Sequence, residues 1–188
     1  MTRLKKLRNS LSRCPIVKFG DYSYFVHSIT DGLPQGDPEV LVEVIDEIIR
    51  IGNFNCNKIV TVEAMGFPIA ALLSVKTGIP YVFIRKRHYG LEGEISVQQV
   101  TGYSEKKLYI NNINQGDKVI FVDDVISTGG SLRAIVKALK NLGAEIKDII
   151  IVFEKTRKKR EIEEELGVKI KTLMGVDVVD GKVVEVPL

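Results

Sequence analysis

Two adjacent carboxylates, Asp123 and Asp124, end an apolar run, and a loop of small residues follows them at 127–131. Two glycines, Gly129 and Gly130, let the main chain of this loop approach a ligand closely. The loop hydroxyls and the first N–H groups of a following helix are donors for an anion, and the helix dipole favours negative charge at the same place. The pattern therefore predicts a phosphate-binding loop.

Carboxylates repel a phosphate, so Asp123 and Asp124 have to serve another part of the same ligand. A carboxylate accepts hydrogen bonds from vicinal hydroxyls, and it holds Mg²⁺ directly or through water. A sugar phosphate with a free diol and a bound Mg²⁺ meets all of these requirements. The loop is not a Walker A motif, which needs a Lys, and the chain has no GxGxxG dinucleotide motif.

The rest of the chain predicts the elements that position this loop. Apolar segments that read as strands occur at residues 58–63, 80–86, 118–122, 148–155 and 169–174. Helical spacing of apolar residues occurs around 4–11, 41–49, 65–78 and 132–142, a charged helix is predicted at 158–167, and a hairpin is predicted to turn at 180–181. Strands that alternate with helices and are apolar throughout are typical of an α/β fold with a parallel sheet covered on both faces. Ligands of such sheets bind beyond the carboxyl ends of the strands, where the two acids are expected.

Composition limits the functional classes. The chain has 188 residues, 45% of them apolar, and a net charge of +3, which fits one globular domain and is too weak to indicate nucleic acid. Two cysteines, Cys14 and Cys56, are not close enough in sequence for a CxxC pair, and we expect both to be reduced thiols. We find no apolar run long enough for a membrane span and no signal peptide, so we expect a cytoplasmic protein that binds no membrane.

The string VIFVDDVISTGGS closely resembles the phosphoribosyl pyrophosphate (PRPP) motif of type I phosphoribosyltransferases. The resemblance implies one domain over residues 1–188 with the fold of that family, a central parallel sheet flanked by helices. It also implies a small hood from about 15–37 with the C-terminal part, and a mobile flap at about 88–109. Asp123 and Asp124 would be catalytic, binding the ribose hydroxyls and holding Mg²⁺ through water. The 5-phosphate of PRPP would be bound by Ser127, Thr128, Gly129, Gly130 and Ser131.

Two further segments agree with this resemblance. The segment VEAMGF after the strand at 58–63 is similar to the pyrophosphate loop of adenine phosphoribosyltransferases, with Met where those enzymes have Arg. PRPP-binding main-chain groups would then come from Ala64, Met65 and Gly66.

Three cations follow the strand at 80–86, in a segment similar to the family's VRK. Pyrophosphate that leaves the ribose develops negative charge, which cations at this position would stabilise. Arg85 and Lys86 are predicted to be catalytic, and Arg87 to bind PRPP.

The base is expected to be selected by Lys155, because FEK resembles the corresponding segment of xanthine and hypoxanthine-guanine enzymes. Lys offers only donors, so it favours the carbonyl of a 6-oxopurine over the amino group of adenine. The hood segment instead resembles adenine enzymes. As a whole the chain is most similar to archaeal-type hypoxanthine/guanine phosphoribosyltransferases, which implies purine salvage that forms IMP or GMP and pyrophosphate from PRPP. Two alternatives stay open: an adenine phosphoribosyltransferase, and a PRPP-sensing regulator that binds nucleic acid.

One position departs from the family pattern. Many hypoxanthine-guanine enzymes have an Asp where this chain has Ser127, and a hydroxyl is a poor general base. Water, a flap carboxylate (Glu92 or Glu94) or a minor tautomer of the substrate could handle the proton, and no general base is assigned. The resemblance also implies a homodimer, with PRPP and a purine base as ligands and Mg²⁺ as cofactor.

Overall fold

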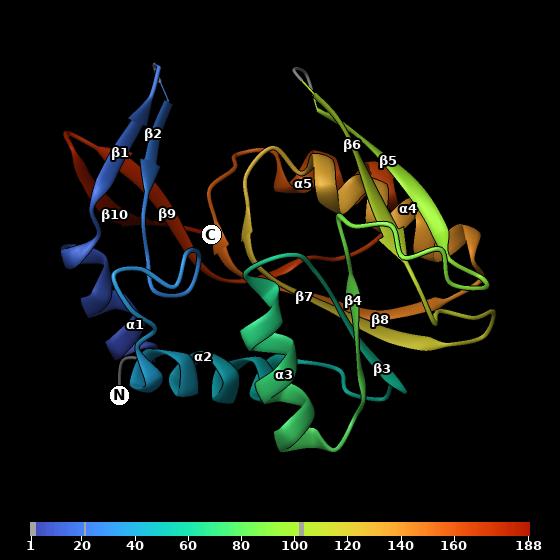
Figure 1. Ribbon diagram of the computed structural model, residues 1–188. Helices are drawn as coiled ribbons and strands as arrows, with labels where there is room; N and C mark the ends of the chain where they lie inside the picture. The colour runs from blue at the N-terminus through green and yellow to red at the C-terminus, as the bar shows by residue number, and fades with distance from the viewer. Residues whose placement is uncertain (1–2, 21, 102–103) are drawn as a thin grey trace.

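A computed structural model of the chain describes residues 3–20, 22–101 and 104–188. Its centre is a six-stranded sheet in the order β10-β9-β8-β7-β3-β4 (Figure 1). The strands are β3 (Lys58–Val62), β4 (Tyr81–Ile84), β7 (Lys118–Ile126), β8 (Glu145–Glu154), β9 (Lys171–Val179) and β10 (Lys182–Val186). All neighbours from β4 to β9 pair in parallel, and β10 pairs with β9 antiparallel at one edge. The predicted parallel sheet is therefore confirmed, with one antiparallel edge strand added.

Helices cover both faces of the sheet. One core lies under α1 (Lys5–Ser10), α2 (Pro38–Ile51) and α3 (Gly66–Thr77), and the other under α4 (Gly130–Asn141) and α5 (Lys159–Leu166). Ile120 of β7 belongs to the first core and its neighbour Phe121 to the second, and both side chains are completely buried. Because both faces are covered, the strand is apolar at successive positions rather than at alternate ones.

The predicted end of the β7 strand at residue 122 is wrong. β7 pairs with β3 only as far as Phe121, but it continues beside the long strand β8 to Ile126. Asp123 and Asp124 therefore lie within β7, on the part that extends beyond β3. The predicted strand at 169–174 was likewise too short, because β9 continues to Val179 as one arm of the predicted C-terminal hairpin.

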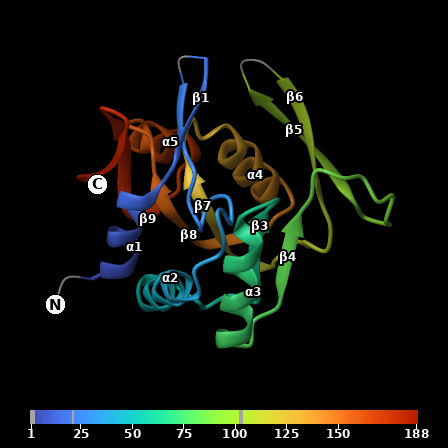
Figure 2. The same ribbon diagram turned by 60° about the vertical axis from the view of Figure 1, so that its left-hand side comes forward.

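Two hairpins extend beyond the carboxyl end of β7, one on each side of it (Figure 2). The first is formed by β1 (Ile16–Phe19) and β2 (Tyr22–Phe25), in the segment predicted as the hood, and follows a short 3₁₀ turn, η1 (Leu11–Arg13). The second, β5 (Ile95–Thr101) with β6 (Ser104–Ile110), lies in the segment predicted as the flap. Part of that flap, residues 102–103, lies outside the described residues.

An ion pair links α1, near the N-terminus, to β10, near the C-terminus. The Arg8 guanidinium forms two hydrogen bonds with the Glu185 carboxylate on β10, one of them 2.9 Å from Nη2 to Oε1. Cys14 and Cys56 are both free thiols, as expected. Within the described residues, no helix combines the length and apolar character that crossing a membrane requires.

Candidate active site

Asp123 and Asp124 lie side by side on the part of β7 that extends beyond the end of β3. Both are partly buried, and Oδ1 of Asp123 accepts a hydrogen bond of 3.0 Å from the Asp124 N–H. Burial raises the pKa of Asp123 well above its ordinary value, and the negative charge of Asp124 raises that pKa further. Burial also raises the pKa of Asp124 to about 6, while a hydrogen bond with Asp123 opposes the shift. A cation or a set of hydroxyl donors bound here would relieve this crowding of negative charge.

The predicted phosphate loop turns directly into α4. Gly129 adopts the left-handed conformation, with φ of 75°, immediately before the helix begins at Gly130. A Cβ on Gly129 would lie 2.5 Å from Cδ1 of Ile162 on α5, so no larger residue fits without movement. Arg133, from the first turn of α4, donates to the Thr128 carbonyl at 2.8 Å and forms an ion pair with a carboxylate of α5. The loop is thus held by contacts with α4 and α5.

The segment between β3 and α3 forms a tight turn close to the acids. The Glu63–Ala64 peptide bond is cis, and α3 begins at Gly66. The hood reaches this turn, because a Cβ on Gly32 would lie 3.6 Å from Cε of Met65. The predicted pyrophosphate-loop residues Ala64, Met65 and Gly66 therefore lie between the hood and the carboxyl end of β7.

Glu63, which the sequence analysis did not assign, organises the predicted cations. Its Oε2 accepts hydrogen bonds from the Lys86 N–H at 3.0 Å and from Arg85 Nε at 3.1 Å. The Lys86 N–H and the Arg85 charge together lower the pKa of Glu63. Arg85 also lies over the ring of Phe67, 5.2 Å from its centroid. The sequence alone does not show this role, because it depends on β3 and β4 being neighbours in the sheet.

The three predicted cations differ in exposure. Arg85 is partly buried by its ion pair, whereas Lys86 and Arg87 are exposed at the mouth of the site. The positive charge of Lys86 lowers the pKa of Asp123, so Lys86 lies near the acids at the carboxyl end of the sheet. Arg87 lies over the ring of Tyr89 at 5.7 Å.

Lys155 lies between β8 and the hood. Its Nζ donates to the Ser23 carbonyl on β2 at 2.7 Å and is 5.6 Å from the centroid of the Phe25 ring. A cavity of about 680 Å³ adjoins it. The cavity is lined mainly by the ends of β8 and β9 and by the C-terminal residues, including Glu154, Lys155, Arg157, Asp177 and Leu188.

The hood also brings a carboxylate that the sequence analysis missed. Asp31 accepts hydrogen bonds from the Tyr24 hydroxyl at 2.7 Å, the His27 N–H at 3.0 Å and the Thr30 hydroxyl at 2.6 Å. Its negative charge contributes to the raised pKa of Asp124, so the hood loop faces the acids. No periodic pattern marks this residue in the sequence.

Glu94, one of the two carboxylates considered as a proton acceptor, instead holds the turn before the second hairpin. Its side chain is 3% exposed and accepts hydrogen bonds from Gly90 N at 3.1 Å and from Asn111 Nδ2 at 2.8 Å. His88 lies 3.1 Å from the same carboxylate. Glu94 is therefore engaged in anchoring the turn, and Glu92 is exposed.

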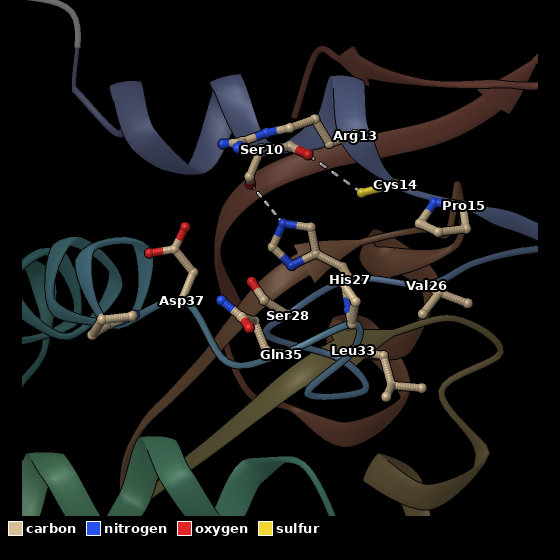
Figure 3. Close-up of a pocket in the computed structure, with 12 residues that line it drawn as sticks. Ser10, Arg13, Cys14, Pro15, Val26, His27, Ser28, Leu33, Gln35 and Asp37 are labelled. Carbon is tan, nitrogen blue, oxygen red and sulfur yellow. Dashed lines mark hydrogen bonds between the residues drawn. The ribbon is translucent and has the colours of Figure 1, made fainter.

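A second cavity, of about 360 Å³, lies under the hood and contains none of the predicted site residues (Figure 3). His27 on its wall is fully paired: Nδ1 accepts from the Ile29 N–H at 3.0 Å, and Nε2 lies 2.6 Å from Ser10 Oγ. Since Ser10 donates its own hydrogen to the Leu7 carbonyl, His27 is neutral with its hydrogen on Nε2. This histidine joins α1 to the hood.

A comparison with protein families matches residues 40–178 to the phosphoribosyl transferase domain. A protein of Methanocaldococcus infernus named hypoxanthine/guanine phosphoribosyltransferase is 57% identical over 180 residues, which cover 95% of this chain and 98% of that protein. A protein of the same name from Methanobacterium lacus is 55% identical over 179 residues, which cover 95% of this chain and 94% of that protein.

Solved structures share the fold at much lower identity. The adenine phosphoribosyltransferase of Thermoanaerobacter pseudethanolicus superposes with a TM-score of 0.75 at 23% identity, covering 90% of this chain and 98% of that one. The enzyme of the same name from Leishmania tarentolae gives a TM-score of 0.75 at 19% identity, covering 93% of this chain and 88% of that one.

Proposed function

The chain belongs to the phosphoribosyl transferase family, and from this premise we propose that it transfers the 5-phosphoribosyl group of PRPP to hypoxanthine or guanine. The products are IMP or GMP and pyrophosphate, and the role is purine salvage. The observation that carries the proposal is the continuous path from Asp123 and Asp124 through the Gly129 turn into α4. This path joins the proposed diol-binding pair on β7 to the proposed phosphate-binding loop at the start of α4.

Mg²⁺ is the cofactor we propose, and the donor set fits it. Asp123 and Asp124 are hard oxygen donors whose raised pKa values a cation would lower again. Among the described residues no group of three or more metal-binding side chains occurs. Mg²⁺ suits such a site, because it is commonly held by one or two carboxylates together with substrate phosphates and water. Its chemistry would be to neutralise charge on the pyrophosphate.

We assign the steps of the reaction to this chain's own groups as follows. Asp123 and Asp124 hold the ribose hydroxyls, while residues 127–131 hold the 5-phosphate and so fix the position of the anomeric carbon. Main-chain groups of residues 64–66, with Arg85, Lys86 and Arg87, stabilise the charge that develops on the leaving pyrophosphate. The β5–β6 hairpin would close over the site and keep water from competing with the base.

Lys155 is proposed to select a 6-oxopurine. The hydrogen bond to the Ser23 carbonyl fixes one of the three donors of the ammonium group and ties β8 to the hood. A carbonyl oxygen on the base would accept a hydrogen bond from this ammonium group, whereas an exocyclic amine offers it no acceptor.

The test is a comparison of hypoxanthine, guanine and adenine at saturating PRPP and Mg²⁺, with product formation followed for each base. Hypoxanthine or guanine should be used much faster than adenine, and Lys155→Met should reduce that preference. Adenine turnover equal to or above that of the oxopurines would contradict the proposed specificity. Binding of nucleic acid without release of pyrophosphate would contradict the enzymatic function altogether.

We also propose that two copies of the chain associate through α3 and β4. Apolar residues occur on every side of α3, which is typical of a helix that is covered all round. Yet Val75 on this helix is 82% exposed, and Tyr81 on the neighbouring edge strand is 44% exposed. The rings of Tyr81, Phe83 and Phe67 stack across this surface. A second copy would cover the same apolar surface on both partners, as a two-fold interface requires.

Light scattering after gel filtration tests this interface. The unmodified protein should have the mass of a dimer, and Val75→Glu should shift it toward the monomer. Val42→Glu is the matched control, because Val42 is also an exposed valine, 46% exposed, but lies on α2. A monomeric mass for the unmodified protein at micromolar concentration would contradict the proposal.

A further inference from the structure

Thr61, next to the last residue of β3, has a buried hydroxyl that the packing of the folded chain does not explain. It is completely buried, and its Oγ1 is the one buried side-chain oxygen or nitrogen without a hydrogen-bond partner among the described residues. An unpaired buried hydroxyl costs about 1–3 kcal/mol, whereas Val has nearly the same shape and no such cost. A polar group kept at this position therefore points to a partner that the ligand-free protein does not supply.

The hydroxyl lies beside one of the two acids. A Cβ on Gly66 would be 1.8 Å from Thr61 Oγ1 and 3.1 Å from Asp123 Oδ1, so both oxygens border the same small space at the start of α3. The Thr61 hydroxyl occupies the space that a side chain at residue 66 would need, so only glycine fits there. The turn of residues 64–66, the Thr61 hydroxyl and Asp123 are thus packed as one unit.

We propose that Thr61 is a positioning residue for Asp123. When PRPP is bound, the hydroxyl donates a hydrogen bond to the Asp123 carboxylate and holds it in the orientation that accepts the ribose hydroxyls. The carboxylate can accept this bond although Oδ1 already accepts from the Asp124 N–H, because each carboxylate oxygen accepts more than one donor. This inference rests on the proposed function, which gives Asp123 its role in binding the diol.

The expected effect is on binding more than on turnover. Asp123 holds the ribose both before and during transfer, and loss of an interaction that is equal in both states raises KM and leaves kcat unchanged. A hydrogen bond to a charged group is strong enough that Thr61→Val should raise the KM for PRPP about tenfold or more. The same variant should melt at an equal or higher temperature, because it removes the unpaired hydroxyl.

Steady-state kinetics with PRPP varied, together with thermal melting, test this inference. Thr61→Ser retains the hydroxyl and should keep the KM within about twofold of the unmodified enzyme, which is under 0.5 kcal/mol. Thr77→Val is the matched control, since that threonine lies at the far end of α3 and donates to the Leu73 carbonyl. If Thr61→Val does not fold, Thr61→Ala serves for the same measurement. An unchanged KM in the variant without a hydroxyl, or equal losses in the Ser and Val variants, would overturn the role of Thr61.

A separate variant distinguishes failure of this inference from failure of the proposed function. Asp123→Asn should abolish detectable PRPP binding if Asp123 holds the diol. Retained PRPP binding in Asp123→Asn would refute the role of the acid itself. Loss of binding in Asp123→Asn with a normal KM in Thr61→Val would refute only the positioning role of Thr61.

Discussion

Acidification is expected to destabilise the folded protein through His27, the histidine that joins α1 to the hood. Its ring is 2% exposed, and burial lowers its pKa from 6.5 to about 4, against the opposing charges of Asp31 and Asp37. Protonation would also place a hydrogen on Nδ1, where the Ile29 N–H already donates. Between pH 6.5 and about 4 the unfolded chain therefore binds this proton and the folded chain does not.

The sign and size of the effect follow from this difference. The stability that neutral His27 provides is fully present above pH 6.5 and is lost as the pH falls toward 4, because the unfolded state then binds more protons. At about 1.36 kcal/mol for each pKa unit, the loss amounts to about 3 kcal/mol. That is a large part of the stability of an ordinary domain.

Urea unfolding of the unmodified protein and of His27→Gln between pH 7.5 and 4 measures this loss. The difference in free energy of unfolding between the two proteins should shrink by about 3 kcal/mol over this range. His88→Gln is the control, because it removes the only other histidine in the sequence, which is exposed. This variant should lose as much free energy of unfolding between pH 7.5 and 4 as the unmodified protein. If His27→Gln loses stability as steeply as the unmodified protein, the assignment of a neutral buried His27 is refuted.

Three further measurements test other parts of the structure. Gly129→Ala should destabilise the protein by about 1–3 kcal/mol and weaken PRPP binding, because φ at this residue is 75° and Ile162 leaves no room for a Cβ. Thermal melting measures the stability and titration with PRPP measures the binding. Unchanged values of both would contradict the tight packing of the loop. Glu94→Gln should speed amide hydrogen exchange at Gly90, since the carboxylate that holds this turn is lost; equal exchange rates would refute the anchoring role. Cys14 should react with a thiol reagent at pH 8 about a hundredfold more slowly than free cysteine, because burial raises its pKa to about 11; a rate near that of free cysteine would contradict this.

The sheet and its helices could be predicted because they follow from burial. Strand β7 is apolar at every position from Val119 to Val122, and such a run requires cover on both faces. The start of α2 was expected too late, around residue 41, because apolar spacing does not show that Asp37 caps the helix by accepting from the Glu39 and Val40 N–H groups. The end of β7 could not be derived, because it depends on how far the neighbouring β8 extends.

The parts of the site that were missed depend on contacts between distant segments. Glu63 binds Arg85 across two strands, and Asp31 faces the acids only because the hood folds back over the sheet. Such contacts need the pairing of elements to be known first. The first hairpin is a different case, because the sequence carries a signal for it that was not used: Gly20 and Asp21 separate the two short strands.

The pairing of Arg8 with Glu185 joins residues that are 177 positions apart in the sequence. In a chain that emerges from the ribosome from its N-terminal end, the early segment that forms one wall of the hood has to wait until the last strand of the sheet has been synthesised. The parallel strands β3, β4, β7 and β8 and the phosphate loop are synthesised before β10, so the hood is expected to be the last part to assemble. A nascent chain would then acquire its ribose-phosphate site before it can discriminate between bases.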